Sequence, residues 1–384
     1  GILMIGAGMA GLSLAALLAR QGAKVTVIDR HDPGAMATDA FDSRTVALSL
    51  GTKKILEALH LWPQLLPVGA AITHIDVQEG HDPFVLNFRA GDVGDQPFGW
   101  IFPNSAVRRA LYDSCCSNGV TFVTGASLET IEQSDADVTA VLSDGKRITG
   151  ALLIGADGRD SRVRALLGID TVRLEYRHTA LVGLIEHEHP HHGLALERFY
   201  PTGPFAALPF TTTPKGRHRS AIVWSRHSRR SLRAPKELQA LTKEIEPMLD
   251  ERYGSIEAVG TWAAFPLSLR HAKTMIAARV ALISDAAHAM HPIAGQGLNL
   301  GMRDVEWLAT HLPSAKDPGG EALLQSYDRA RRGDVLALMA ATDLLSRLFG
   351  NNVPPLRWAR SLGLGIVERI PPLKEFFMRQ AMGG

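Results

Sequence analysis

Three glycines near the start of the chain have the spacing of a phosphate-binding turn. They are Gly6, Gly8 and Gly11 in the stretch GAGMAG, which follows the apolar run ILMI and leads into a helical pattern. In a dinucleotide-binding unit the first glycine permits the tight turn, the second lets a pyrophosphate approach the backbone, and the third lets the helix pack on the strand. Ala10 belongs to the same turn, and the N-terminus of the following helix would face the phosphates.

An acidic residue at the end of the next apolar run is consistent with the same chemistry. The run KVTVIDR ends in Asp29 and Arg30, and an aspartate there would accept hydrogen bonds from the ribose of an adenosine. A glycine turn of an ordinary α/β protein is the alternative. The order strand, glycine turn, helix, strand and acid favours the dinucleotide. This fingerprint alone does not separate NAD from FAD.

Two later segments also place an aspartate where a strand ends. LIGADGRDSRVR, residues 153–164, contains Asp157, and LISDAAHAMHPIAGQGLNLG, residues 282–301, contains Asp285. In an open α/β sheet, ligands bind beyond the carboxyl ends of the strands. We therefore expect these two segments and the glycine turn to converge on one extended ligand.

The end of the second segment suggests a site for developing negative charge. Gly295 and Gly297 would leave backbone N–H groups unobstructed, and GLNLGMRDVEWLA behind them has a helical pattern. The N-terminus of a helix stabilises negative charge. The pyrimidine edge of a reduced flavin carries such charge, so the loop is a candidate flavin contact.

Histidines and arginines in three places invite other interpretations. His288 and His291 could bind zinc together, but Pro292 follows at once and neither a third ligand nor an HExxH pattern is nearby. Four histidines in EHEHPHHG, residues 186–193, are typical of a solvated hairpin loop that binds metal adventitiously, so we predict no functional metal site. The basic cluster RHSRRSLR, residues 226–233, is either a solvated loop or a contact for an acidic partner or an anionic lipid surface.

Strand and helix patterns alternate in the parts of the chain that carry these motifs. Strands are expected at 2–5, 24–30, 71–102 and 279–285, a hairpin at 137–150, and helices at 12–23, 44–66, 105–119 and 301–312. Between 172 and 270 the patterns are mostly those of strands, interrupted by one helix at 235–249, and the chain from 322 onwards is mostly helical. This order predicts an α/β ligand domain with an inserted β-rich domain.

Composition limits the class of protein. Lys plus Arg is 41 and Asp plus Glu is 39, a balance that argues against a general nucleic-acid binder. The two cysteines, Cys115 and Cys116, are adjacent and too few for a disulfide framework, which favours a reducing, cytoplasmic setting. We expect neither a secretory signal, because residues 1–18 are already patterned as strand, turn and helix, nor a membrane-spanning helix.

The three motifs in this order resemble the flavoprotein aromatic hydroxylases, the single-component FAD monooxygenases. Within that group, DSRTVALS at 42–49 and SDAAHAMHPIAGQGLNLGMRDVEWLA at 284–309 are similar to the ubiquinone-biosynthesis hydroxylases. The resemblance implies a Rossmann-like FAD-binding domain with an inserted β-sheet substrate domain and a helical C-terminal segment. The implied boundaries are 1–70, 100–172 and 271–330 for the FAD-binding domain, 71–99 and 173–270 for the substrate domain, and 331–384 for the helical segment.

The resemblance also implies cofactor-binding residues. For the ADP half of FAD they are Gly6, Gly8, Ala10, Gly11, Asp29 and Arg30. For the pyrophosphate, the ribityl chain and the flavin ring they are Arg44, Arg108, Asp157, Gly158, Asp285, Pro292, Gly295, Gln296, Gly297, Leu298 and Asn299. Asp157 and Gly158 form the motif that the family links to both FAD and nicotinamide cofactors. One position departs from the family: Ser284 stands where a glycine usually precedes the aspartate.

The implied reaction uses FAD, NAD(P)H and O₂. Because only one glycine fingerprint is present, NAD(P)H is expected to dock transiently rather than in its own Rossmann domain. The resemblance implies a flavin C4a-hydroperoxide that hydroxylates the ring of a prenylated phenol in ubiquinone synthesis, with no general acid or base assigned to the protein. Alternatives are a hydroxylase of another small aromatic, a non-hydroxylating flavin oxidoreductase, and a non-catalytic FAD-binding assembly protein.

The C-terminal stretch bears on partners. Residues 356–383 mix large apolar side chains with Arg and Lys, which favours either a peripheral contact with the inner membrane or with other ubiquinone-biosynthesis proteins, or ordinary packing on the FAD domain. Monomer and dimer both remain open.

Overall fold

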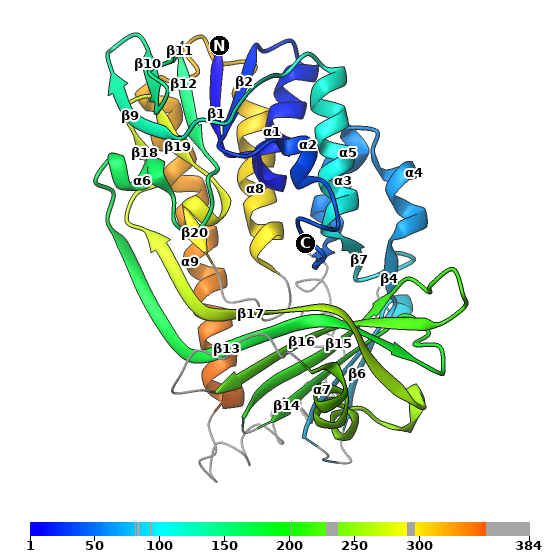
Figure 1. Cartoon of the computed structure of the whole chain (residues 1–384). Helices are drawn as coiled ribbons and strands as arrows, with labels where there is room; N and C mark the ends of the chain where they lie inside the picture. Colours follow the sequence, from blue (N-terminus) through cyan, green and yellow to red (C-terminus); the bar gives the residue numbers. More distant parts are fainter. Residues whose placement is uncertain are drawn as a thin grey trace.

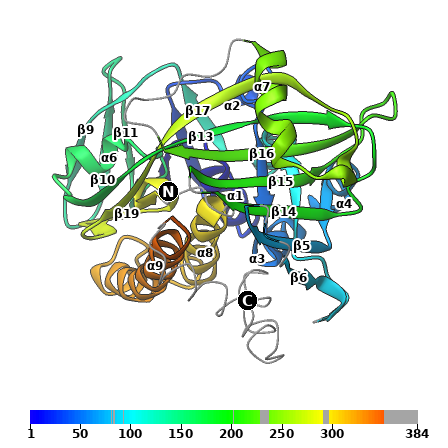
Figure 2. The ribbon, with the colours of Figure 1, turned by 90° about the horizontal axis from the view of Figure 1, so that it is seen from below.

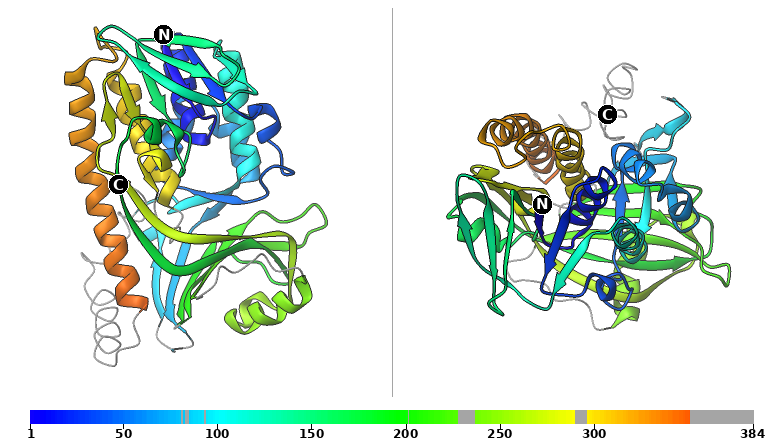
Figure 3. Two further views of the ribbon diagram at one scale, coloured as in Figure 1. Left: turned by 60° about the vertical axis from the view of Figure 1, so that its left-hand side comes forward. Right: turned by 90° about the horizontal axis from the view of Figure 1, so that it is seen from above.

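The computed structural model describes residues 1–80, 82, 85–92, 94–200, 202–227, 237–289 and 296–350, and every structural statement refers to these. Figure 1 shows two parts. The upper part contains a parallel sheet and several helices, and the lower part contains a broad, mainly antiparallel sheet. Helix α9 (Glu321–Gly350) runs along the side of both parts, as the left view of Figure 3 shows. The predicted α/β class is confirmed.

The upper part is built on a six-stranded sheet with the order β18-β19-β12-β1-β2-β8. Its strands are β1 (Ile2–Ile5), β2 (Val25–Asp29), β8 (Thr121–Thr124), β12 (Leu152–Gly155), β18 (Ile276–Ala277) and β19 (Val280–Leu282). Every described pairing is parallel except that of β18 with β19. The strands β1, β12 and β19 are buried along their whole length, as apolar runs in parallel sheets are.

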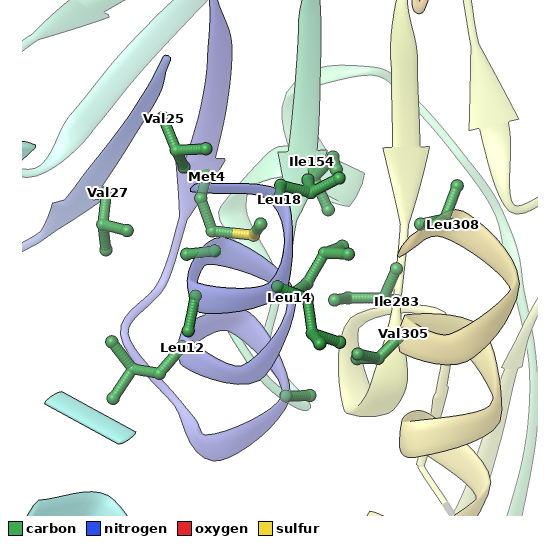
Figure 4. Packing of buried hydrophobic residues seen from close by; sticks show 14 of the residues in the cluster. Met4, Leu12, Leu14, Leu18, Val25, Val27, Ile154, Ile283, Val305 and Leu308 are labelled. Atoms are coloured by element: carbon green, nitrogen blue, oxygen red, sulfur yellow. The ribbon is translucent and has the colours of Figure 1, made fainter. Parts of the chain in front are cut away.

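Helix α1 (Met9–Arg20) lies against this sheet with α5 (Asn104–Ser117) and α8 (Gln296–His311) as neighbours. Figure 4 shows Leu14 of α1 pointing toward Ile283 and Val305, while Leu12 and Met4 lie on the side of β2. Each of these side chains is at most 1% exposed. Burying a side chain of this size contributes about 1.5–3 kcal/mol, so this core fixes the helix on the strand ends.

The lower part is an eight-stranded sheet with the order β20-β17-β13-β16-β15-β14-β5-β6. Its strands are β5 (His74–Glu79), β6 (Val85–Arg89), β13 (Thr171–His187), β14 (Leu194–Tyr200), β15 (Gly203–Phe210), β16 (His218–His227), β17 (Ile256–Ala272) and β20 (His288–Ala289). Helix α7 (Leu238–Ile245) packs on one face of it. Figure 2 shows the sheet from below, with α7 on its near side. The predicted domain boundaries stay a prediction.

Two small sheets complete the described fold. The predicted hairpin is confirmed as β10 (Val138–Leu142) and β11 (Arg147–Gly150), which β9 (Leu128–Gln133) extends. The other sheet has the order β3-β7-β4, with β3 (Thr45–Leu48), β4 (Ala70–Ile72) and β7 (Gly99–Pro103).

The predicted helix over 44–66 is wrong at its start. The run TVAL forms β3, because its residues pair with Trp100 to Pro103 of β7. A helix, α3 (Leu50–Ala58), begins only after Ser49, whose side chain accepts a hydrogen bond from the Thr52 N–H. A second short helix, α4 (Trp62–Leu65), follows. Tertiary pairing, which the local pattern does not contain, decides this segment.

Candidate functional site

The glycine turn has little room at two positions and open space at the third. Gly6 has φ of +105°, and a Cβ there would clash with the Ala156 carbonyl. A Cβ on Gly11 would clash with the Gly6 carbonyl oxygen. A Cβ on Gly8 would meet only the Ala156 carbonyl oxygen, at 3.9 Å, so a ligand can approach the backbone at this residue.

The start of helix α1 can receive an anion. Helix α1 begins at Met9 after Gly8, and no side chain caps it. The first N–H groups of a helix have no acceptor within the helix, so they and the positive end of the helix dipole favour a phosphate. Ala10 is buried in this first turn.

Asp29 lies beside the same turn. Its Oδ2 accepts a hydrogen bond from the Ala7 N–H at 2.7 Å, and its Oδ1 accepts one from the His31 N–H at 2.9 Å. A carboxylate oxygen can accept a further bond, so a ribose hydroxyl could still bind here. Arg30 follows Asp29 on the exposed surface.

The structure brings the three predicted strand-end segments together. Their strands β1, β12 and β19 are neighbours in the sheet. The Ile283 N–H donates to the Gly155 carbonyl oxygen at 2.9 Å. The buried Arg164 connects the last two segments, because its Nη1 donates to the Ala286 carbonyl oxygen at 2.7 Å and its Nη2 donates to the Arg159 carbonyl oxygen at 2.8 Å.

Asp157 stands at the start of helix α6 (Arg162–Leu166). Its Oδ2 accepts hydrogen bonds from the Arg162 and Val163 N–H groups at 2.6 and 3.0 Å. Its Oδ1 is buried and has no hydrogen-bond partner within the described chain. Gly158 has φ of +83°, and a Cβ there would meet no atom within 4 Å. This corner therefore holds one carboxylate oxygen free for a ligand.

Asp285 lies in the short 3-10 helix η5 (Ser284–Ala286) at the end of β19. Burial raises the pKa of its carboxyl group, and Arg159, His288 and Arg44 only partly oppose this effect. No hydrogen bond to its carboxylate occurs among the described residues. Hydroxyl donors of a ribityl chain would supply what the protein does not.

An acidic residue that the sequence reasoning missed organises both predicted arginines. Asp42 accepts hydrogen bonds from Arg44 Nε at 2.7 Å and Arg44 Nη2 at 2.8 Å, and from Asn104 Nδ2 at 2.8 Å. Its Oδ2 lies 3.8 Å from Arg108 Nη2. The available signal was the acid two residues before Arg44 in DSRT.

Arg108 is the less neutralised of the two arginines. Its Nε and Nη1 are buried without a hydrogen-bond partner in the described chain. Burial lowers the pKa of Arg108, an effect that Asp42 only partly opposes. A buried guanidinium with unused donors suits an anionic group such as a pyrophosphate.

The side chain of Asn299 makes hydrogen bonds within the protein, and its predicted flavin contact stays a prediction. Its Oδ1 accepts hydrogen bonds from the Ser49 N–H at 3.0 Å and from Thr52 Oγ1 at 2.7 Å, and its Nδ2 donates to the Ala47 carbonyl oxygen at 3.0 Å. The side chain thus joins α8 to β3 and α3. Gly297 and Leu298 lie in the first turn of α8, whereas Pro292, Gly295 and the side chain of Gln296 lie outside the described residues.

A buried network behind Asp285 was also missed. Asp304 of α8 is fully buried, and its Oδ2 accepts hydrogen bonds from the Ser284 N–H at 2.8 Å and His288 Nε2 at 2.6 Å. Its Oδ1 accepts one from Arg331 Nε of α9 at 2.8 Å. Asp304 therefore positions the loop that carries Asp285. His288 belongs to this network.

Ser284 adopts the left-handed conformation, with φ of +54°. Glycine adopts such backbone angles freely, whereas other residues lose about 1–2 kcal/mol there. Its side chain fills the space beside Gly301 of α8, since a Cβ on Gly301 would lie 2.6 Å from the Ser284 Cβ and would clash with its Oγ. The serine in place of the family's glycine is thus accommodated by a glycine on the facing helix.

This pairing predicts strong coupling between the two positions. Gly301→Ala alone should destabilise the FAD-free protein by about 1–3 kcal/mol through overcrowding. In the Ser284→Gly background the same change should cost clearly less, because the clashing Cβ and Oγ are gone and only the Cα of residue 284, 3.0 Å from the new Cβ, still has to shift. Urea denaturation of the four variants measures the coupling energy. Additive effects would contradict the proposed fit.

Two of the four histidines of residues 186–193 are hydrogen-bonded within the protein. His187 bonds to Ser220 Oγ at 3.0 Å and to the His189 carbonyl oxygen at 2.7 Å. His191 bonds to the Phe210 carbonyl oxygen at 2.9 Å. Within the described ranges there is no cluster of three His, Cys, Asp or Glu side chains that could hold a metal ion. His291 and most of 226–233 lie outside them.

Comparison with known proteins agrees with this geometry. Residues 1–342 match the family described as "FAD binding domain". Ubiquinone hydroxylase UbiL of Rhodospirillum rubrum is 38% identical over 391 residues, covering 100% of this chain and 89% of that protein. The 3-demethoxyubiquinol 3-hydroxylase of Escherichia coli is 30% identical over 390 residues, covering 100% of this chain and 98% of that protein.

Solved structures agree with the fold. The p-nitrophenol 4-monooxygenase PnpA from Pseudomonas putida superposes with a TM-score of 0.80 at 18% identity, covering 100% of this chain and 98% of that one. PqsL from Pseudomonas aeruginosa, described as a probable FAD-dependent monooxygenase, superposes with a TM-score of 0.75 at 22% identity, covering 91% and 96%.

Proposed function

The chain belongs to the FAD binding domain family, in the group that includes the ubiquinone hydroxylases, and on this premise we propose that it hydroxylates the aromatic ring of a prenylated phenol in ubiquinone biosynthesis. As a member of this family it is an FAD-dependent monooxygenase. The proposal adds the substrate class and the use of NAD(P)H and O₂. A non-hydroxylating oxidoreductase and an FAD-binding assembly protein are the rival functions.

The observation that carries the proposal is the meeting of three strand-end loops at the carboxyl ends of neighbouring parallel strands. The glycine turn and the start of α1 would hold the pyrophosphate, with Arg108 balancing its charge. Asp29 would bind the adenosine ribose, and Asp285 the ribityl chain. Bound FAD supplies the redox chemistry, taking electrons from NAD(P)H and activating O₂.

The remaining tasks fall to the protein. In this proposal the large sheet would carry the aromatic ring and keep water away from it. NAD(P)H would dock transiently, because the sequence has a single glycine fingerprint.

A prenyl tail implies access to a membrane surface. No helix in the described ranges is long and apolar enough to cross a membrane. For the prenyl tail we propose peripheral contact at the inner membrane. The segment 356–383, for which this contact was predicted, lies outside the described residues.

One experiment separates the rival functions. The FAD-loaded protein is reduced anaerobically with NADH or NADPH and then mixed with isotope-labelled O₂ and a short-chain prenylated phenol. The proposal expects flavin reduction and one labelled oxygen atom in the phenol. Flavin reduction without a labelled product would favour an oxidoreductase. If neither NADH nor NADPH reduces the flavin, a binding protein is favoured. Quinone profiling of a deletion strain then identifies the step, because the accumulated intermediate is the substrate.

A further inference from the structure

One face of the eight-stranded sheet carries a row of small, partly accessible side chains. The row crosses six strands in register through the pairs Ala263–Val182, Val182–Val223, Val223–Ala206, Ala206–Glu197 and Glu197–Val77. Side chains paired in this way point to the same face of a sheet. All six are only partly buried, whereas their chain neighbours Leu181, Ile222 and Leu196 are buried on the opposite face beneath α7. We call these six residues the small-residue row.

The row lies on the sheet face that also contacts the three-stranded sheet and Arg44. On four of the strands, the residue two positions along from the row packs with the three-stranded sheet β3-β7-β4. These residues are Leu184, Ala221, Leu208 and Ala195. On the opposite side of the row, two positions from Ala263 on β17, the ring centroid of Phe265 lies 5.1 Å from the guanidinium carbon of Arg44. The β17 end of the row therefore lies between the three-stranded sheet and Arg44.

Glu197 is the one ionisable member of the row. Its neighbour Arg198 points to the other face, where it bonds to Gln78 and Asp250. In the part of the chain that the structure describes, Glu197 has neither a hydrogen-bond nor an ion-pair partner. Burial raises the pKa of its carboxyl group, although the side chain remains partly accessible. The carboxyl group is therefore largely surrounded by protein while it stays partly accessible.

An unpartnered carboxyl group in such a place costs free energy, so a ligand that pairs with it gains specificity. A phenol suits this wall, since the ring can lie on small apolar side chains while its hydroxyl donates one hydrogen bond. Sites built around such a bond reject analogues that lack the donor, because the buried acceptor is then left unpaired.

We propose that Glu197 accepts a hydrogen bond from the ring hydroxyl of the aromatic substrate, and that the small-residue row is the wall on which the ring lies. This inference rests on the proposed function and adds to it the residue that selects a free hydroxyl. Glu197 is thus assigned to substrate recognition, with no proton transfer required of it.

The test compares two ligands on the FAD-loaded protein: a phenol with a short prenyl tail, and its O-methyl ether. Calorimetric titration of wild type should give about 10- to 100-fold tighter binding of the phenol, as expected for a hydrogen bond to a buried acceptor that is otherwise unpaired. Glu197→Leu should bind the two ligands within about threefold of each other. The matched control is Glu257→Leu, the same change at an exposed position of β17, which should keep the wild-type preference.

The outcomes are distinguishable from failure of the proposed function. If wild type binds and hydroxylates the phenol but Glu197→Leu keeps the full preference, the role of Glu197 is overturned while the function stands. If wild type neither binds nor hydroxylates any prenylated phenol, the proposed function fails and this inference fails with it. Should Glu197→Leu lose its FAD, Glu197→Gln replaces it, and a severalfold smaller preference is then the supporting result.

Discussion

Replacing Asp304 by asparagine is expected to destabilise the protein by about 3–5 kcal/mol, the usual cost of breaking a buried ion pair from one side. Asp304 is fully buried and accepts hydrogen bonds from three donors, two of which belong to His288 and Arg331. The asparagine amide would bring N–H groups toward at least one of these donors and would leave the Arg331 charge without its buried partner. Urea denaturation of the FAD-free protein measures the loss.

The same substitution should weaken FAD retention, because Asp304 holds the backbone of Ser284 next to Asp285. The matched control is Asp334→Asn. Asp334 also bonds Arg331, but it is 34% exposed, so its loss should cost at most about 1 kcal/mol. Equal losses for the two variants would contradict a special role for the buried carboxylate.

The loss of stability at low pH gives a second, independent test of the role of Asp304. Burial alone would raise the pKa of this carboxyl, but His288 and Arg331 outweigh it and lower the pKa below the ordinary 3.8. A carboxyl whose folded pKa is depressed stabilises the protein above 3.8 and loses this contribution as pH falls through the folded value. The acid-induced loss of stability should therefore be shallower in Asp304→Asn. An unchanged slope would place the depressed pKa elsewhere.

The parts of the site that the sequence predicted are those in which a local pattern dictates the geometry. Gly6 and Gly11 are required by clashes within the strand–turn–helix unit itself, and Asp157 and Asp285 follow strands that are apolar throughout. The convergence of the loops follows from the rule for parallel sheets.

Groups that depend on contacts between distant segments could not be read from the sequence. Asp304 meets Arg331 only because α9 packs on α8, and Asn299 is used by residues 250 positions earlier. The segment TVAL is a strand because β7 is beside it, although the neighbouring pattern is helical. Glu197 has an unremarkable place in the sequence, and only the register across β5, β14 and β15 places it on the face toward the site.

Replacing Asp285 by asparagine should have opposite effects on the empty protein and on the cofactor complex. Burial raises the pKa of Asp285 because no described donor compensates its charge, so the ionised form is unfavourable in the FAD-free fold. Asparagine has the same shape without the charge and should raise the midpoint of thermal unfolding of the FAD-free protein. FAD affinity should fall about 10- to 100-fold, because hydrogen bonds from ribityl hydroxyls to a carboxylate are lost.

The expected rise in the unfolding temperature of the FAD-free Asp285→Asn protein depends on pH, and the direction of this dependence can be predicted. A carboxyl with a raised folded pKa binds its proton more tightly in the folded state, so its destabilising effect appears only as pH rises above the ordinary 3.8 toward the folded value. The difference in unfolding temperature between Asp285→Asn and wild type should thus be largest at neutral pH and should vanish below 3.8. The matched control is Asp160→Asn, whose side chain is 88% exposed near the same loops and should change neither quantity.

Two results would count against the assignment of Asp285. A lower unfolding temperature in the FAD-free Asp285→Asn protein would mean that the protein itself already compensates the charge. Unchanged FAD affinity, measured by quenching of flavin fluorescence, would mean that the carboxylate does not contact the cofactor. The expected pattern, a more stable empty protein that holds FAD less well, is that of a binding residue kept in an unfavourable state until its ligand arrives. The Asp304→Asn variant, by contrast, should lose both stability and FAD affinity, because Asp304 supports the loop whether or not FAD is bound.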